Sequence, residues 1–393
     1  MDIAILLSAM AAITPNMNDD VISQVKGEFE SGGNWPYEIG SHIFKQNPFS
    51  EKWPGARVFA GHEDQLRQLQ ENIQRNANTF ITGPFGVGKT ILTKTMYEIL
   101  SDVEGYYPIF VNVEEGRFSK AMAEMILDEL QLEYNSSTKQ SDLYQIIIEE
   151  LEDLHNQGTR TIIFYDEVIN ASDGTLRSIL HLQRDVEDWE PVLVFNGTIN
   201  IRDELGQKIR PLSDRISAQI HLEPFDIDAT HNFVNKRLRH SCSSSEWNGD
   251  GCDHDEGSIK PLTRDAVSLV HQDVTAYPRN LRDQLNVLLE YGARHELDEI
   301  DYSVAEEVIQ NTAEDKIERI PRRSLRVIEF LNESGPSSAN AISESINESA
   351  YHVQDTLNSL DEDGLLRPTK SGRGVAYSLT SQAKKGLSNL KES

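Results

Sequence analysis

Cysteine is nearly absent from this chain: only Cys242 and Cys252 occur among its 393 residues. Two cysteines cannot form the disulfide framework of a small secreted protein, so a reducing, cytoplasmic environment is predicted. Long hydrophobic runs are also missing, because the apolar stretch at residues 3–13 is too short to span a bilayer. No basic residue precedes that stretch, as one would in a signal peptide. The sequence therefore predicts no membrane association.

Basic residues are scarce, with 37 lysines and arginines against 64 aspartates and glutamates and a formal charge of -27. Hydrophobic residues still make up 38% of the chain, which indicates a folded acidic protein and not a disordered acidic tail. A large acidic excess keeps a protein soluble in high salt, so we expect a halophilic source, with an ordinary acidic mesophilic protein as the alternative. The length allows two or three domains of ordinary size.

Residues 1–46 show no clean period and are interpreted as an N-terminal extension. Between residues 47 and 224, short apolar segments alternate with helical patterns. The segments expected to be strands are 79–82, 107–113, 161–165, 192–195 and 218–222. Buried strands separated by helices predict an α/β domain whose mostly parallel sheet is covered on both faces.

Two further domains are expected after residue 224. Residues 225–318 carry helical patterns that predict a small helical lid domain; these patterns lie at 233–239, 264–271, 281–294 and 304–313. In residues 319–393, three short helical patterns precede a segment at 365–367, a Gly-Arg-Gly turn and an apolar strand at 375–379. Three helices followed by a hairpin is the order typical of a winged-helix domain.

The first expected strand leads directly into a glycine-rich segment that matches the pattern G-x-x-x-x-G-K-[ST]. Its residues are Gly83, Pro84, Phe85, Gly86, Val87, Gly88, Lys89 and Thr90. The glycines let successive backbone N–H groups turn inward around phosphate oxygens, and the following helix adds the positive end of its dipole. Lys89 is expected to reach the β- and γ-phosphates, and the Thr90 hydroxyl to ligate Mg²⁺. The segment therefore predicts a nucleoside-triphosphate site.

The expected strand at 161–165 ends in two carboxylates, Asp166 and Glu167. Because the carboxyl ends of parallel strands meet at one edge of a sheet, both residues are expected near the phosphate loop. Asp166 would hold the shell of the Mg²⁺ ion, and Glu167 would polarise the attacking water as general base. The alternative is a solvated Asp-Glu pair that merely closes the strand, in which case nucleotide would bind without being hydrolysed.

These motifs resemble those of AAA+ ATPases and, within them, the archaeal relatives of the origin-recognition and cell-division-control replication initiators. The resemblance covers about residues 47–390. It implies a P-loop sheet domain, a lid and a winged helix, with ATP and Mg²⁺ as ligands and a slow, switch-like ATPase. The sequence departs from the family at His62, where related proteins usually carry arginine after the glycine of the first conserved box.

The resemblance also implies three residues that complete the ATPase site. The polar "sensor 1" position is Asn200 by the family's G-x-x-N tetrad, or Asn196 by its closeness to the strand end. In residues 211–216, Arg215 resembles an arginine finger that is presented to a neighbouring subunit, which implies a homo-oligomer; Arg210 is the competing residue.

In residues 276–281, Arg279 resembles the "sensor 2" arginine of the lid, which would contact the γ-phosphate. A proline just before a helix, with arginine in its first turn, would fix the direction of that side chain. Arg282, one turn later, is the alternative.

Basic charge gathers at the end of this acidic chain. Within 364–393 the basic residues are Arg367, Lys370, Arg373, Lys384, Lys385 and Lys391, against the single acidic residue Glu392. Contact with phosphates of double-stranded DNA is the simplest use of such a segment. In the winged-helix interpretation, residues 349–360 form the helix in the major groove, although its polar members include no lysine or arginine. A winged helix that binds a protein is the alternative.

Residues 240–258 form an insertion rich in serine, glycine and aspartate, predicted to be a loop. His240, Cys242, Cys252 and His254 within it could make a tetrahedral zinc site. Their spacing departs from the common C-x-x-C knuckle, so a loop without metal is the favoured interpretation.

The leading hypothesis is an ATP-dependent, DNA-binding replication initiator or helicase loader. The second is a regulatory AAA+/STAND-like ATPase switch of a mobile element or signalling system, whose winged helix binds a protein partner. A protein-remodelling hexamer ranks last, because the segment 112–119 offers only Phe118 as an aromatic pore residue.

Overall fold

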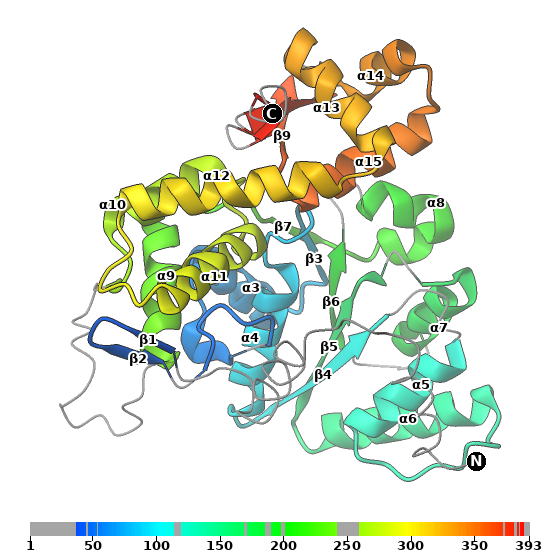
Figure 1. The fold of residues 1–393 in the computed structure, drawn as a ribbon. Coiled ribbons are helices and arrows are strands. Elements are labelled where there is room, and N and C mark those ends of the chain that lie inside the picture. The colour runs from blue at the N-terminus through cyan, green and yellow to red at the C-terminus, as the bar shows by residue number, and fades with distance from the viewer. Residues whose placement is uncertain are drawn as a thin grey trace, which may run out of the picture.

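The protein is described here by a computed structural model. It describes residues 37–44, 46–52, 54–113, 119–168, 171–184, 190–197, 201–241, 259–371, 374–380, 383–384 and 386–388. Figure 1 shows a central sheet flanked by helices, a bundle of helices beside it, and a smaller C-terminal region above them.

The central sheet has five parallel strands in the order β4-β5-β6-β3-β7. The strands are β3 (Thr79–Thr82), β4 (Tyr106–Asn112), β5 (Arg160–Asp166), β6 (Val192–Gly197) and β7 (Ala218–His221). Strands β3, β5 and β6 are buried almost throughout, as their continuous apolar runs predict for a sheet covered on both faces. The expected α/β fold and its five strands are confirmed.

Each face of the sheet packs against its own layer of helices. One layer contains α3 (Glu63–Gln74), α4 (Lys89–Ser101) and the short helix η1 (Ala56–Val58). The other layer contains α5 (Ser119–Glu129), α6 (Gln140–Asn156), α7 (Asp173–Arg184) and α8 (Ile201–Ser213). Along β5, Ile162 and Phe164 face the first layer, whereas Ile163 and Tyr165 face the second, because side chains alternate across a strand.

Four helices form the lid: α9 (Ile227–Ser241), α10 (Arg264–Asp273), α11 (Pro278–Arg294) and α12 (Tyr302–Arg319). A hairpin of β1 (Tyr37–Ile39) and β2 (His42–Phe44) packs on them, with Ile39 and Phe44 buried in the lid core. The sequence assigned residues 1–46 to an N-terminal extension with no clean period and did not predict this hairpin. Strands of three residues are too short to give a readable alternation.

The C-terminal region has a hydrophobic core of its own. It contains α13 (Arg322–Ser334), β8 (Ser337–Ser338), α14 (Ala339–Ile346), α15 (Ala350–Glu362), β9 (Leu366–Ser371) and β10 (Gly374–Leu379). Its strands are antiparallel in the order β8-β10-β9. The long helix α12 leads from the lid into this region (Figure 1). Nowhere in the described residues is a helix long and apolar enough to cross a membrane.

Candidate nucleotide-binding site

The glycine-rich loop joins the carboxyl end of β3 to the first residue of α4, as its pattern predicts. Gly86 and Gly88 have φ angles of 75° and 106°, a region that residues with a side chain rarely adopt. These two positions explain why the loop needs glycine. The helix N-terminus behind the loop carries backbone N–H groups without partners in the helix, which suits an anion.

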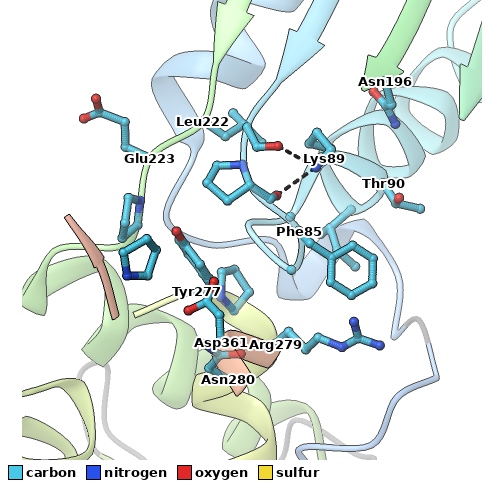
Figure 2. Close-up of a pocket in the computed structure, with 18 of the residues that line it drawn as sticks. Phe85, Lys89, Thr90, Asn196, Leu222, Glu223, Tyr277, Arg279, Asn280 and Asp361 are labelled. Carbon is cyan, nitrogen blue, oxygen red and sulfur yellow. Dashed lines mark hydrogen bonds between the residues drawn. The ribbon is translucent and has the colours of Figure 1, made fainter. Parts of the chain in front are cut away.

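Lys89 lies back across the loop. Its Nζ donates to the carbonyl oxygens of Gly83, at 2.9 Å, and Pro84, at 2.8 Å (Figure 2). Burial lowers the pKa of Lys89 to about 8, although the carboxylates of Asp166 and Glu167 act to raise it. The ammonium group is thus held at the loop by weak carbonyl acceptors that phosphate oxygens could replace.

Three side chains meet beside the loop: Thr90 from the first turn of α4, and Asp166 and Asn196 from the carboxyl ends of β5 and β6. The Thr90 hydroxyl donates to Asp166 Oδ2 at 2.8 Å, and Asn196 Nδ2 donates to Asp166 Oδ1 at 2.7 Å. Asp166 and Asn196 meet because β5 and β6 pair Tyr165 with Phe195, the residues just before them. The Asn196 amide also donates to Thr93, while its own oxygen is buried without a hydrogen-bond partner.

The oxygens of Thr90 and Asp166 fit a magnesium ion. Mg²⁺ prefers oxygen ligands and takes only one or two from a protein when phosphates and water supply the rest. The described residues contain no cluster of three or more His, Cys, Asp or Glu side chains that could bind a metal without such help. A hydroxyl and a carboxylate at the mouth of a phosphate loop are therefore a donor set for a nucleotide-bound cation.

Glu167 follows Asp166 but occupies a different environment. Its backbone is left-handed, with φ of 54°, and its side chain is exposed within the same cavity. A non-glycine residue in this conformation is uncommon and is often found at functional sites. Asp166 is buried and fixed by two donors, whereas Glu167 is accessible to a water molecule. The two carboxylates are thus suited to different tasks.

Arg279 reaches the loop from the lid. Its backbone N–H donates to the Gly86 carbonyl at 3.3 Å, and its guanidinium lies 4.4 Å from the centre of the exposed Phe85 ring (Figure 2). Pro278 stands at the first position of α11, as the sequence predicts. Arg282, the alternative, instead forms ion pairs with Glu51, at 3.3 Å, and Asp283. The geometry therefore favours Arg279.

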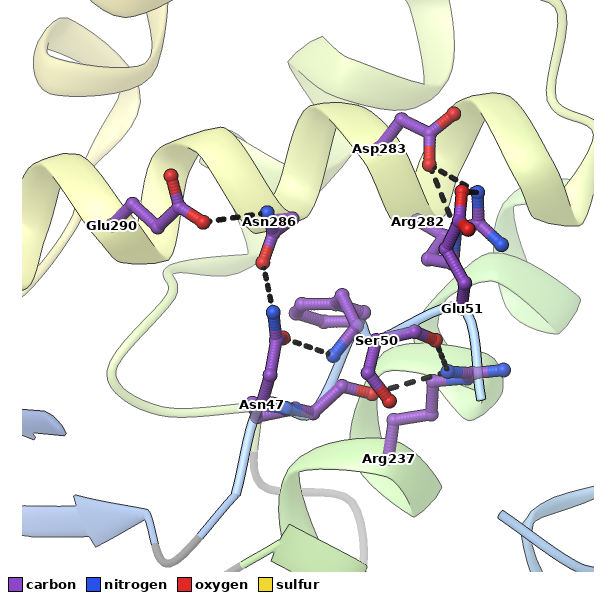
Figure 3. Close-up of polar contacts among 10 residues, drawn as sticks. Asn47, Ser50, Glu51, Arg237, Arg282, Asp283, Asn286 and Glu290 are labelled. Atoms are coloured by element: carbon purple, nitrogen blue, oxygen red, sulfur yellow. Dashed lines mark hydrogen bonds and ion pairs between the residues drawn. The ribbon is translucent and has the colours of Figure 1, made fainter. Parts of the chain in front are cut away.

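The segment at residues 47–51 is tied to the lid beside this site (Figure 3). Arg237 of α9 donates to the carbonyls of Pro48 and Ser50, at 3.2 and 3.3 Å, and Asn47 donates to Asn286 of α11 at 2.6 Å. These contacts hold the start of the α/β domain against the lid helices. Residues 47–50 are therefore fixed to two lid helices, α9 and α11.

His62, where the family usually has arginine, contacts the loop from behind. Its Nε2 lies 2.9 Å from the Val87 carbonyl oxygen, and its ring packs edge-on against Phe225 at 5.0 Å between centroids. Burial is the main cause that lowers the pKa of His62. The imidazole therefore supports the loop through the Val87 carbonyl.

Arg215 lies apart from these residues. It stands before the first residue of β7, at the amino edge of the parallel sheet, and pairs with Glu190 at 3.3 Å. Arg210, its competitor, pairs with Asp214 at 3.6 Å on the surface. Within one chain Arg215 cannot reach the phosphate loop at the opposite edge, so any catalytic role would have to be played in a neighbouring subunit.

Several predicted residues lie outside the described part of the chain. They are Asn200, Cys242, Cys252, His254, Arg373, Lys385 and Lys391. His240 is described, near the end of α9. The zinc hypothesis and the choice of Asn200 therefore stay predictions.

A cavity of about 1180 Å³ joins these residues. Its walls include the phosphate loop, Asp166, Glu167, Asn196 and the start of α11. The C-terminal region supplies a further wall, through α15 and the β9-β10 hairpin. Sequence reasoning did not predict this wall, because it depends on packing between segments far apart in the chain.

Part of the chain matches a known protein family. Residues 72–205 match the family model described as "AAA domain". An uncharacterised protein of Methanocaldococcus jannaschii is 22% identical over 138 residues, which make up 35% of this chain and 11% of that protein. The match therefore spans only about a ninth of that relative's length.

Solved structures are similar over most of their length. The Aeropyrum pernix ORC2 protein, in ADPNP-ADP complexes, has a TM-score of 0.56 at 13% identity, covering 89% of this chain and 98% of that one. The Aeropyrum pernix ORC1 protein in complex with DNA has a TM-score of 0.51 at 16% sequence identity, and the match covers 88% of this chain and 95% of that one. CDC6P from Pyrobaculum aerophilum has a TM-score of 0.55 at 14% sequence identity, and the match covers 88% of this chain and 97% of that one. The chain has an AAA+ fold that resembles these archaeal proteins.

Proposed function

We propose that this chain binds and slowly hydrolyses ATP with Mg²⁺, and that it acts as a DNA-binding replication initiator or helicase loader. The arrangement of Thr90, Asp166 and Asn196 beside the phosphate loop is the observation that carries the first part. A strand that merely ends in an Asp-Glu pair would need none of these contacts. A hydrolytic site needs two oxygens that can bind a cation, next to a polar group that can orient water.

Each side chain has a distinct role in the proposed reaction. The loop N–H groups and Lys89 bind the β- and γ-phosphates, and Thr90 and Asp166 hold the magnesium ion. When bound, this ion neutralises charge that develops on the transferring phosphoryl group. Glu167, whose side chain is exposed in the cavity, orients the attacking water and accepts its proton.

Arg279 would leave Phe85 for the γ-phosphate, since a charged ligand attracts a guanidinium more strongly than an aromatic face does. Such a movement would draw the start of α11 toward the loop. ATP binding would then close the lid, which gives the switch-like behaviour that the resemblance implies.

Two substitutions test the ATPase proposal. Lys89→Ala should abolish ATP binding in a calorimetric titration with Mg²⁺ present, because it removes the ammonium group from the loop. Glu167→Gln should keep ATP affinity within a few fold but stop phosphate release. Lys94→Ala is the matched control, since Lys94 lies on the same helix α4 but packs over Phe110. Normal phosphate release by Glu167→Gln would remove this residue from the general-base role.

The DNA-binding part rests on the C-terminal region. Its helices α13 to α15 and the β9-β10 hairpin follow one another in the order of a winged helix, with α15 at the position of the helix that enters the major groove. The basic residues near the chain end would contact phosphates. Fluorescence anisotropy with a labelled duplex, measured at several salt concentrations with and without ATP, tests this part. No binding at any salt concentration would exclude the initiator.

The second hypothesis, a regulatory AAA+/STAND-like switch with a protein partner, has one observation in its favour. Tyr351 at the start of α15 is 78% exposed, and the helix carries no lysine or arginine. Exposed aromatic residues are common anchors of protein interfaces. A pull-down that recovers a protein partner, and loses it in Tyr351→Ser, together with no binding to duplex DNA, would favour this alternative.

A further inference from the structure

Helix α15 turns part of its polar face toward the nucleotide cavity. Gln354, Asn358 and Asp361 are four and three residues apart, so they lie along one side of the helix, and all three line the cavity that contains the phosphate loop. Val353 and Leu357 point to the other side and are buried in the C-terminal core. Gln354 and Asn358 are among the few polar side chains of this helix that could read base edges.

Two cationic side chains hold the C-terminal region on the lid. Arg367 of β9 donates to the carbonyls of Gln272 and, at 3.3 Å, Val274, at the end of α10. The carbonyl end of a helix attracts cations. Lys316 of α12 donates to the carbonyl of Asp363 at 2.7 Å, just after α15. Arg367 is one of the basic residues expected to contact DNA, yet it is engaged with the protein.

The docked region also lies close to the turn that precedes Arg279. Tyr277 is buried, precedes Pro278 and lines the same cavity as Asp361. Figure 2 shows Asp361 close to Tyr277, and the Asp361 carboxylate contributes to the raised pKa of Tyr277, after the larger effect of burial. The position of α15 and the position of the sensor arginine are therefore linked through one buried tyrosine.

We propose that this docking is autoinhibitory: Gln354 and Asn358 of α15, two of the side chains that would read base edges, face the nucleotide cleft of the same chain, where a duplex cannot reach them. A major groove admits a helix only when that helix presents a free face. DNA binding must therefore break the contacts of Lys316 and Arg367, and the docked form binds DNA weakly. The inference rests on the proposed DNA-binding function.

Linkage makes the effect reciprocal. If docking supports the turn of Tyr277 and Arg279 in its present position, then undocking changes ATP affinity by the same factor by which ATP changes undocking. The carboxylates of Asp361 and Asp363, at the end of α15, would be repelled by the phosphates of a nearby duplex. This repulsion disfavours DNA at the docked helix.

Lys316→Met tests the proposal on the full-length protein. Methionine keeps the length of the side chain but cannot donate to Asp363. We expect the variant to bind duplex DNA at least threefold more tightly than the wild type, and peptides from α15 to exchange amide hydrogens faster in the absence of DNA. Loss of one positive charge alone would weaken DNA binding, so tighter binding has no simple electrostatic explanation. Lys139→Met, an exposed lysine at the start of α6, is the control for lost charge.

The outcomes are distinguishable. Unchanged exchange and unchanged affinity would show that Lys316 does not hold a docked state, and faster exchange with equal or weaker DNA affinity would show that docking does not inhibit. Either result overturns the inference and leaves DNA binding in place. If neither the wild type nor the variant binds DNA, the proposed DNA-binding function itself fails, and the inference with it.

Discussion

At the scale of single residues, the site is organised by Asp166. The sequence alone left two asparagines for the position that orients water. The register of β5 and β6 favours Asn196, because it places this amide 2.7 Å from Asp166 Oδ1. The family's sequence tetrad favours Asn200, which lies outside the described residues.

Substitution of the two asparagines separates these interpretations. Asn196→Ala should lower the turnover number of ATP hydrolysis by about 100-fold, as the loss of one positioned polar group in an active site typically does. ATP affinity should change little, because the amide contacts Asp166 and not the phosphate loop. Steady-state kinetics of Asn196→Ala and Asn200→Ala measure this. A large loss in Asn200→Ala alone would identify Asn200 as the residue that orients the water.

The pKa of Lys89 predicts a pH dependence of ATP binding. Burial lowers this pKa to about 8 in the protein without nucleotide. A bound phosphate favours the charged amine and raises the pKa, so binding takes up a proton when the free protein has lost it. Affinity should fall about twofold between pH 7 and pH 8, where half of the free amine is deprotonated, and then more steeply, approaching about tenfold per pH unit. Titrations from pH 7 to 9.5 measure this; affinity that stays constant to pH 9.5 would contradict it.

At the scale of elements, the loop and α11 are in close contact. A Cβ atom added to Gly86 would lie 3.0 Å from the Cβ of Arg279, and the φ angle of 75° disfavours any side chain there. The N-terminus of the lid helix can approach the loop only because this residue is glycine.

Gly86→Ala should therefore weaken ATP binding. A left-handed backbone costs a residue with a side chain about 1–2 kcal/mol, which corresponds to roughly a tenfold loss in affinity if the loop changes shape to relieve it. Gly206→Ala in α8 is the control, since its added Cβ would make only ordinary contacts, and alanine favours a helix. Equal ATP affinity in wild type and Gly86→Ala would show that the loop tolerates a side chain.

The sequence predicted some elements better than others. Strands β3, β5 and β6 were predicted because they are buried on both faces and read as continuous apolar runs, whereas the edge strands β4 and β7 are partly exposed. Helix α8 was not predicted: Pro211 lies inside it and Ile209 has non-helical angles, so its apolar period is broken by a kink. The site followed from the strands, because parallel strands bring their ends to one edge. Docking of α15 could not be predicted, since it depends on contacts across the fold.

At the scale of the whole molecule, Arg215 could take part in ATP hydrolysis only within an assembly. Its distance from the loop of its own chain leaves a neighbouring subunit as the place where it could act, and its partner Glu190 lies on the same exposed edge. If it is an arginine finger, ATP turnover per chain should rise with protein concentration.

Arg215→Ala should remove this rise. At high concentration the variant should hydrolyse ATP about a thousandfold more slowly than the wild type, whereas at high dilution the two should be equal. Arg210→Ala is the matched control, because Arg210 lies on the same segment and pairs with Asp214. Turnover that is independent of concentration in the wild type would argue against a finger that acts between subunits.

The most direct test of the account is a crystal structure with Mg²⁺ and a non-hydrolysable ATP analogue. We expect the β- and γ-phosphates inside the loop at residues 83–88, Lys89 Nζ moved from the carbonyls of Gly83 and Pro84 to phosphate oxygens, and the metal ion between Thr90 and Asp166. An analogue bound elsewhere, or a loop that excludes it while Lys89 keeps its present contacts, would contradict the account.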